Sequence, residues 1–127
     1  MKMIKGLFIK EPWITLILEG KKTWEIRGSN SHIRGRIALI GSGTGEVKGY
    51  VDIVDSIPLG GDYFDQSENF HRICQSRYSS NNMPYKKTHA WVFSNPKQLI
   101  NGIKFTPKKG CVIWININDI EVIDNAN

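Results

Sequence analysis

The beginning of the chain combines an apolar segment with a segment of helical periodicity. Residues 2–9 are mostly apolar and predict a short strand. After them, apolar residues recur at helical spacing at Trp13, Ile14, Ile17 and Leu18. Pro12 is tolerated in a first helical turn, and Gly20 is a common C-terminal stop. The pattern therefore predicts an amphipathic helix over residues 11–19.

Directly after this helix, the period of the pattern changes to two. Thr23, Glu25 and Arg27 fall on one face of a predicted strand. Trp24 and Ile26 fall on the other face, which is apolar. The pattern therefore predicts a strand that presents a polar face to a site or to solvent.

The rest of the chain contains further strand patterns. The apolar segment 37–40 and the alternating segment 47–57 flank a glycine-rich connection at 41–45, and together they predict a hairpin. Residues 88–94 alternate again, and a connector is expected after Asn95 and Pro96. Residues 111–117 are rich in Val, Ile and Trp and predict a final strand.

The middle of the chain, residues 58–87, is the one long section without a strand pattern. Residues 62–77 predict a helix, with acidic residues near its start, and residues 79–87 are polar. The section is interpreted either as a mobile lid or substrate-shaping insert, or as a packed helix that closes one end of a barrel. The predicted fold class is α+β: a small mixed, partly closed β-barrel of about six strands with two or three short helices.

Composition agrees with one folded domain over residues 1–127. Hydrophobic residues make up 40% of the chain and charged residues 23%, which is enough for a packed core and excludes a disordered or fibrous protein. The longest apolar stretch, residues 13–18, is too short to cross a bilayer, and no signal-peptide pattern is present. We expect a cytoplasmic monomer without a membrane partner.

The charge balance is basic. Lys and Arg number 17 against 12 Asp and Glu, which gives a net charge of +5 at pH 7. Residues 20–36 contain five of these cations against one acidic residue, Glu25. Such a balance suits partners that carry phosphates, although a solvated surface that keeps the protein soluble explains it equally well.

The cysteines and histidines do not predict a metal site or a disulfide. Cys74 and Cys111 are far apart in sequence, and both are expected to be buried thiols. His71 and Cys74 are three residues apart, and His32 and His89 would have to join them in space. Because the paired ligand spacings of closed zinc sites are missing, no metal is expected.

The densest cluster of candidate chemistry is the segment GKKTWEIR at residues 20–27. Glu25 and Arg27 share a strand face, so the guanidinium either orients the carboxylate or reaches a ligand phosphate. Lys22, desolvated beside another cation, would have a lowered pKa and serve as a nucleophile or base, while Glu25 passes protons. The alternative is an Arg–Glu pair on a barrel rim with solvated lysines.

At these residues the chain resembles the ASCH domain family. Pro12 and Trp13 precede the segment at 20–27, and residues 33–37 and 89–92 follow it in the same order. The family signature G-x-K-T/R-x-E-x-R and the later R-G-x-I/L segment match Gly20, Lys22, Thr23, Glu25, Arg27, Arg34, Gly35 and Ile37. The resemblance covers residues 5–117.

The resemblance implies a PUA-like fold with a cleft between the barrel and its helices. Family members are variously associated with nucleic-acid binding, ribonuclease activity and deacylation of acetylcytidine nucleosides. The amidohydrolase branch has a lysine matching Lys22 but a threonine where this chain has Glu25, and a glutamate in a later helical region that Glu68 matches only by region. Fold membership alone does not choose among these activities.

We therefore expect a protein that binds RNA or another single-stranded nucleic acid. Lys22, Arg27 and Arg34 would contact phosphates, and Trp13 would stack on a base, whereas Trp24, Trp91 and Trp114 are assigned to the core. The candidate catalytic residues are Lys22 and Glu25, and the candidate binding residues are Trp13, Lys22, Thr23, Arg27, Arg34, Ser42 and His89.

Three alternatives remain open on the sequence. The first is an amidohydrolase that acts on acylated or otherwise modified nucleosides. The second is a ribonuclease, the one case in which a divalent metal would be expected as a cofactor. The third is a non-catalytic protein-interaction module, for which the sequence shows no exposed hydrophobic stripe.

Overall fold

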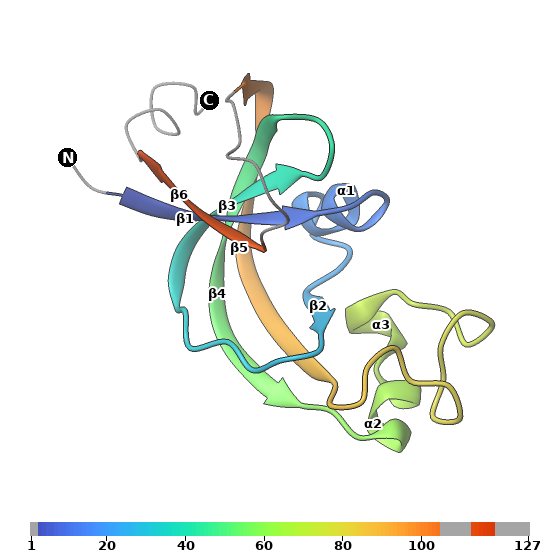
Figure 1. Ribbon diagram of the computed structural model, residues 1–127. Helices are drawn as coiled ribbons and strands as arrows, with labels where there is room; N and C mark the ends of the chain where they lie inside the picture. The colour runs from blue at the N-terminus through green and yellow to red at the C-terminus, as the bar shows by residue number, and fades with distance from the viewer. Residues whose placement is uncertain (1–2, 105–112, 119–127) are drawn as a thin grey trace.

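The structure, a computed structural model, describes residues 3–104 and 113–118. These residues form a single six-stranded sheet with three short helices (Figure 1). The strand order is β2-β5-β4-β3-β1-β6. In chain order the elements are β1 (Met3–Ile9), α1 (Trp13–Leu18), β2 (Trp24–Arg27), β3 (Gly35–Gly41), β4 (Glu46–Pro58), α2 (Gly61–Gln66), α3 (Glu68–His71), β5 (His89–Lys104) and β6 (Trp114–Asn118).

The prediction of a small mixed α+β domain is therefore confirmed. Strands β1 and β3 are parallel, and the other neighbouring pairs are antiparallel. The long strands β4 and β5 curve strongly (Figure 1). The sheet is not closed, since β2 and β6 are its two edges. No helix in the described residues is both long enough and apolar enough to cross a bilayer.

The predicted hairpin is present, but the expected break after residue 94 is not. Strands β3 and β4 pair in antiparallel register. Strand β5 continues through Asn95 and Pro96, because a bulge absorbs them: the pairing moves from Asp52↔Ser94 to Tyr50↔Lys97. Asn95 adopts a left-handed φ of 52° there. A bulge suits proline, which has no N–H to donate to a ladder.

The helix predicted over residues 62–77 is wrong in its length. It divides into α2 and α3 at Ser67. The hydroxyl of Ser67 donates a hydrogen bond to the carbonyl of Tyr63, while its backbone N–H donates to the carbonyl of Phe64. Helix α3 ends at His71, and the next residue, Arg72, has a left-handed φ of 62°. Residues 72–87 then form turns and loops beside α3 (Figure 1).

The cysteine prediction is corrected at one position. Cys74 is exposed, because the chain has left the helix before reaching it, and its Sγ lies 3.0 Å from the Ser76 hydroxyl. Hydrogen bonding to Ser76 lowers the pKa of the Cys74 thiol. Cys111 lies outside the described residues.

Two parts of the core determine where a site can form. One part lies between α1 and the sheet and includes Leu7, Ile17 and Trp91. The other lies between β2 and the α2–α3 section and includes Trp24 and Phe64. Trp24 and Trp91 are buried as expected, and the half-buried Trp114 stacks on Trp91 with ring centroids 5.7 Å apart.

Candidate functional site

A pocket of about 490 Å³ lies where the end of β1, the start of α1, strand β2 and the loops after α3 meet. Its lining residues come from segments far apart in sequence. They are Phe8, Lys10, Trp13, Lys22, Glu25, Ile26, Arg27, Ser42, Ile73, Arg77, Tyr78, Pro84, Tyr85 and Ile113.

The end of α1 turns Lys22 toward the interior. Gly20 takes a φ of +80°, a conformation that side-chain-bearing residues rarely adopt. The backbone N–H groups of Lys21 and Lys22 then both donate to the carbonyl of Leu16, at 2.9 and 3.0 Å. This tight turn directs the Lys22 side chain inward, where it is only 1% exposed.

The Lys22 ammonium group lies at the floor of the pocket between three partners. Its Nζ donates to the carbonyl of His71 at 2.5 Å and lies 3.9 Å from Oε1 of Glu25. It also lies 4.9 Å from the centroid of the Trp13 ring. Burial lowers the pKa of Lys22 from 10.5 to about 8, although Glu25 opposes this shift and Arg27 adds to it. Lys22 is therefore a buried amine that gives up its proton more easily than an ordinary lysine.

Glu25 is shared between two cations. Nε of Arg27 donates to Oε2 of Glu25 at 2.9 Å, while Lys22 faces the other carboxylate oxygen. A terminal nitrogen of Arg27 also donates to the carbonyl of Phe8 at 2.9 Å, and its guanidinium lies 5.5 Å from the Trp91 ring centroid. These contacts fix both side chains, so the floor of the pocket has a defined arrangement of donors and acceptors.

His71 supports the floor from behind. Its Nε2 lies 2.8 Å from the carbonyl of Phe64, and its Nδ1 accepts a hydrogen bond from the N–H of Ile73 at 2.9 Å. This pairing requires a neutral imidazole with the proton on Nε2. Burial, the largest cause, lowers the pKa of His71 and keeps the ring neutral. The sequence identified His71 only as a metal-ligand candidate, and the described residues contain no group of three possible ligands.

The mouth of the pocket carries a cation that sequence reasoning missed. Arg77 is exposed, and its guanidinium carbon lies 5.9 Å from the Trp13 ring centroid and 5.8 Å from that of Tyr78. A turn closed by the N–H of Arg77 and the carbonyl of Cys74, 3.0 Å apart, places it there. The helical pattern over 62–77 gave no signal for this position, because the turn depends on α3 ending early.

The structure brings five of the predicted site residues together. Trp13, Lys22, Glu25, Arg27 and Ser42 all line the pocket. Ser42 comes from the glycine-rich connection after β3, where its N–H donates to the carbonyl of Ile9 at 3.0 Å. These residues remain the candidates for binding and chemistry.

The other predicted binding residues are not among the described residues that line the pocket. The backbone N–H of Thr23 donates to the carbonyl of Phe70, and the carbonyl of Thr23 accepts a hydrogen bond from the N–H of Phe93. Arg34 donates to the carbonyls of Ser31 and Ile33.

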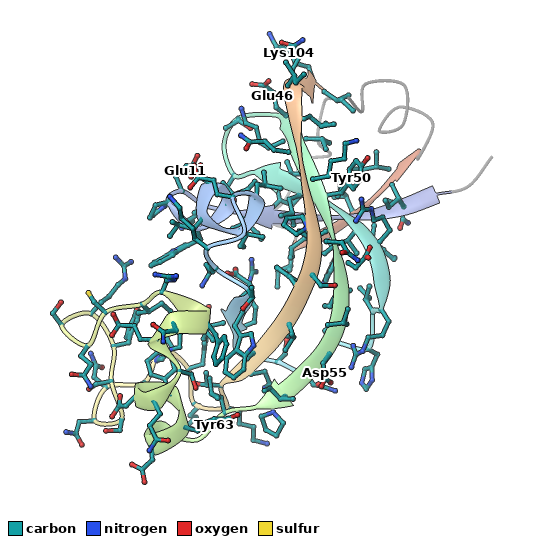
Figure 2. All side chains as sticks on the ribbon, turned by 180° about the vertical axis from the view of Figure 1, so that it is seen from behind. Glu11, Glu46, Tyr50, Asp55, Tyr63 and Lys104 are labelled. Carbon is teal, nitrogen blue, oxygen red and sulfur yellow. The ribbon has the colours of Figure 1, made fainter. Side chains whose placement is uncertain are left out.

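The surroundings of these residues place them outside the pocket. Arg34 lies 3.9 Å from a carboxylate oxygen of Asp55, which Figure 2 labels beside β4. His89 pairs with Arg27 in the β2–β5 ladder, and its buried Nδ1 has no hydrogen-bond partner in the described part of the chain. Glu68 is exposed on α3, apart from the lining residues.

Comparison with known proteins gives the fold and the family. A crystal structure of ASCH from Zymomonas mobilis matches with a TM-score of 0.75 at 12% identity, covering 97% of this chain and 95% of that one. Crystal structures of two mutant forms of the Zymomonas mobilis protein match with TM-scores of 0.71 at 13% identity, covering 94% of this chain and 92% and 94% of theirs.

No curated protein matches the chain. The family model described as "ASCH domain" matches residues 7–121, which include every described residue that lines the pocket. The resemblance inferred from the segment at 20–27 is thereby confirmed. The chain belongs to the ASCH domain family.

Proposed function

We propose that this ASCH domain binds RNA or another single-stranded nucleic acid by taking one nucleotide into the pocket. The observation that carries the proposal is the fixed polar floor made by Lys22, Glu25 and Arg27 beneath aromatic walls. An interior of about 490 Å³ falls within the range of ligand pockets and exceeds what ordinary packing defects provide.

The walls suit a nucleobase. Trp13, Tyr78 and Tyr85 line the pocket and supply aromatic surface for a planar ligand, with Arg77 next to the rings of Trp13 and Tyr78. Stacking of a base on an aromatic side chain contributes about 1–3 kcal/mol and tolerates any base. This supports recognition of a base that has left its neighbours, as occurs readily in a single strand.

The floor suits a base edge better than a backbone phosphate. Lys22 and Arg27 are donors only, and Glu25 is an acceptor, so the three together complement an edge that carries both kinds of group. Lys22 is 1% exposed, which places it deep below the mouth. Lys22 is therefore assigned to contact with the base and not, as the sequence suggested, with a phosphate.

Replacement of Tyr85 by alanine is expected to weaken binding of a single-stranded RNA by roughly five- to a hundredfold, the equivalent of one lost stacking contact. Tyr85 is 43% exposed and lines the pocket, so its loss removes a wall with little effect on the core. Fluorescence anisotropy of labelled RNA and DNA oligonucleotides measures the change.

Tyr63→Ala is the matched control for that experiment. Tyr63, labelled at α2 in Figure 2, is 53% exposed and is not among the described residues that line the pocket, so its loss should leave affinity unchanged. Log affinity of the wild type should also fall linearly with log salt if phosphates contribute. Equal effects of the two tyrosine variants, or no binding to either polymer at low salt, would refute the proposal.

A second candidate, hydrolysis of an acylated nucleoside, is favoured by the lowered pKa of Lys22 beside a carboxylate. In this reaction neutral Lys22 or Glu25 removes a proton from water as the water oxygen adds to the acyl carbon. The C–N bond of the amide then breaks, and the nucleoside amine leaves with a proton returned by the same pair. The products are a carboxylate and the free amine.

Lys22→Ala is expected to lower kcat/KM for such a substrate by roughly 10²–10⁴, the usual range for loss of an acid–base group. A panel of N-acylated cytidine and adenosine nucleosides, followed by chromatography of the released nucleoside, measures it. Lys21→Ala serves as the control, because Lys21 is exposed and pairs with Glu19. Inactivity of the wild-type protein on the whole panel would remove this candidate.

A further inference from the structure

The pocket lining contains two cations that do not contact the carboxylate of its floor. Of the described residues that line it, Lys10, Lys22, Arg27 and Arg77 are cations and Glu25 is the carboxylate. Lys22 and Arg27 both contact Glu25, as described above. The remaining two cations, Lys10 and Arg77, are exposed and therefore belong to the mouth.

Neither mouth cation has an acidic partner in the described ranges. The ion pairs there involve other lysines and arginines. Glu11, next to Lys10 in sequence, instead accepts hydrogen bonds from the backbone and hydroxyl of Thr15 at 3.3 and 2.7 Å. Arg77 lies against the rings of Trp13 and Tyr78. The rings thus orient the guanidinium, whose N–H groups have no acidic partner in the part of the chain that the structure describes.

We propose that Lys10 and Arg77 form a phosphate-binding pair at the pocket mouth, so that the pocket selects nucleotides over neutral nucleosides. The inference rests on the proposed function, because the base of the same ligand would occupy the floor. The phosphate belongs either to a free nucleotide or to a phosphodiester within a strand.

The chemistry of the two side chains supports a phosphate. A guanidinium presents parallel N–H donors that match two phosphate oxygens, and a lysine adds a mobile point charge. The two come from different segments, the residue after β1 and the turn after α3, and both line the pocket. A neutral nucleoside would leave both charges without a counter-charge.

Calorimetric titration with a nucleoside, its 5′-monophosphate and a trinucleotide tests the proposal, repeated for each of the four RNA bases. We expect the monophosphate to bind at least about tenfold more tightly than the nucleoside, because the nucleoside lacks the charged hydrogen bonds that the phosphate accepts. Arg77→Gln and Lys10→Gln should each reduce this preference, and Arg77→Lys should retain part of it. If the trinucleotide binds more tightly than the monophosphate, the phosphate belongs to a strand. If the two bind with equal affinity, it belongs to a free nucleotide.

Arg34→Gln is the matched control, since Arg34 carries the same charge on the surface and is not among the lining residues described for the pocket. It should leave the preference intact. Equal affinity for nucleoside and monophosphate, or an undiminished preference in both glutamine variants, would overturn the phosphate pair and leave nucleoside binding standing. Failure of the wild type to bind all three ligand types would overturn the proposed function together with this inference.

Discussion

Lys22→Met is expected to weaken nucleotide binding without unfolding the protein. It is also expected to remove a pH-dependent contribution to the free energy of unfolding. The pKa of Lys22 is about 8 in the folded chain and about 10.5 when the group is free in water. Between these values the unfolded chain binds more protons, so the free energy of unfolding rises with pH. The contribution of Lys22 over this window is on the order of 3 kcal/mol.

The variant has a methionine of similar length and no charge to bury. At pH 7 the variant avoids the free-energy cost of burying an ammonium group, but the carbonyl of His71 loses its hydrogen-bond donor. Because these two effects oppose each other, the free energy of unfolding should change little. Between pH 8 and 10.5 the wild type should gain stability relative to the variant. At pH 7, where Lys22 of the wild type carries its proton, nucleotide affinity of the variant should be at least tenfold lower, since a buried floor donor is lost.

Urea unfolding at several pH values, together with titration of a nucleotide, measures both effects. Lys21→Met is the control, because Lys21 has a side chain that is 61% exposed and pairs with Glu19 at the surface. Its unfolding curve should follow the wild type across the pH range. A difference between wild type and Lys22→Met that stays constant from pH 7 to 10.5 would show that Lys22 is not a desolvated amine.

Gly49→Ala is expected to destabilise the fold by about 3 kcal/mol or more, at the upper end of overpacking effects. A Cβ at Gly49 would lie 2.3 Å from the carbonyl oxygen of Lys97 and 2.7 Å from a methyl carbon of Leu18. The first is backbone of β5, which cannot move without breaking the β4–β5 ladder. The second belongs to α1, the helix that positions Trp13 and Lys22.

Gly60→Ala is the comparison for this substitution. Gly60 has a φ of −77°, and no atom lies within 4 Å of its added Cβ, so its stability should change by no more than about 0.5 kcal/mol. Urea midpoints at constant m-value report both substitutions. Equal midpoints for the two variants would contradict the close approach of α1 and β5 at Gly49.

Local patterns predicted much of the sheet and the central part of the site. The period-two pattern put Glu25 and Arg27 on one face, and the structure pairs them at 2.9 Å. The same reasoning assigned Trp24 and Trp91 to the core, where both are buried. These features depend on neighbours in one strand, which is what a sequence pattern reports.

Features that depend on distant contacts were not predictable in this way. The sequence left Lys22 open between a desolvated amine and a solvated lysine, and its partner inside the fold, the carbonyl of His71, is 49 residues away. Arg77 reaches the mouth because α3 ends at a left-handed Arg72, whose Nε donates to the carbonyl of Lys21. Strand β5 passes Asn95 and Pro96 because β4 accommodates a bulge. Each of these results from tertiary contacts that override local preference.

The pairing of β1 with β6 has a consequence for biosynthesis. The N–H of Phe8 donates to the carbonyl of Ile113 at 3.2 Å, and both residues line the pocket. One wall is thus assembled from segments that leave the ribosome at very different times. A nascent chain from which residue 113 has not yet emerged lacks this part of the lining, so the proposed ligand would meet a complete pocket only after that residue has docked against β1.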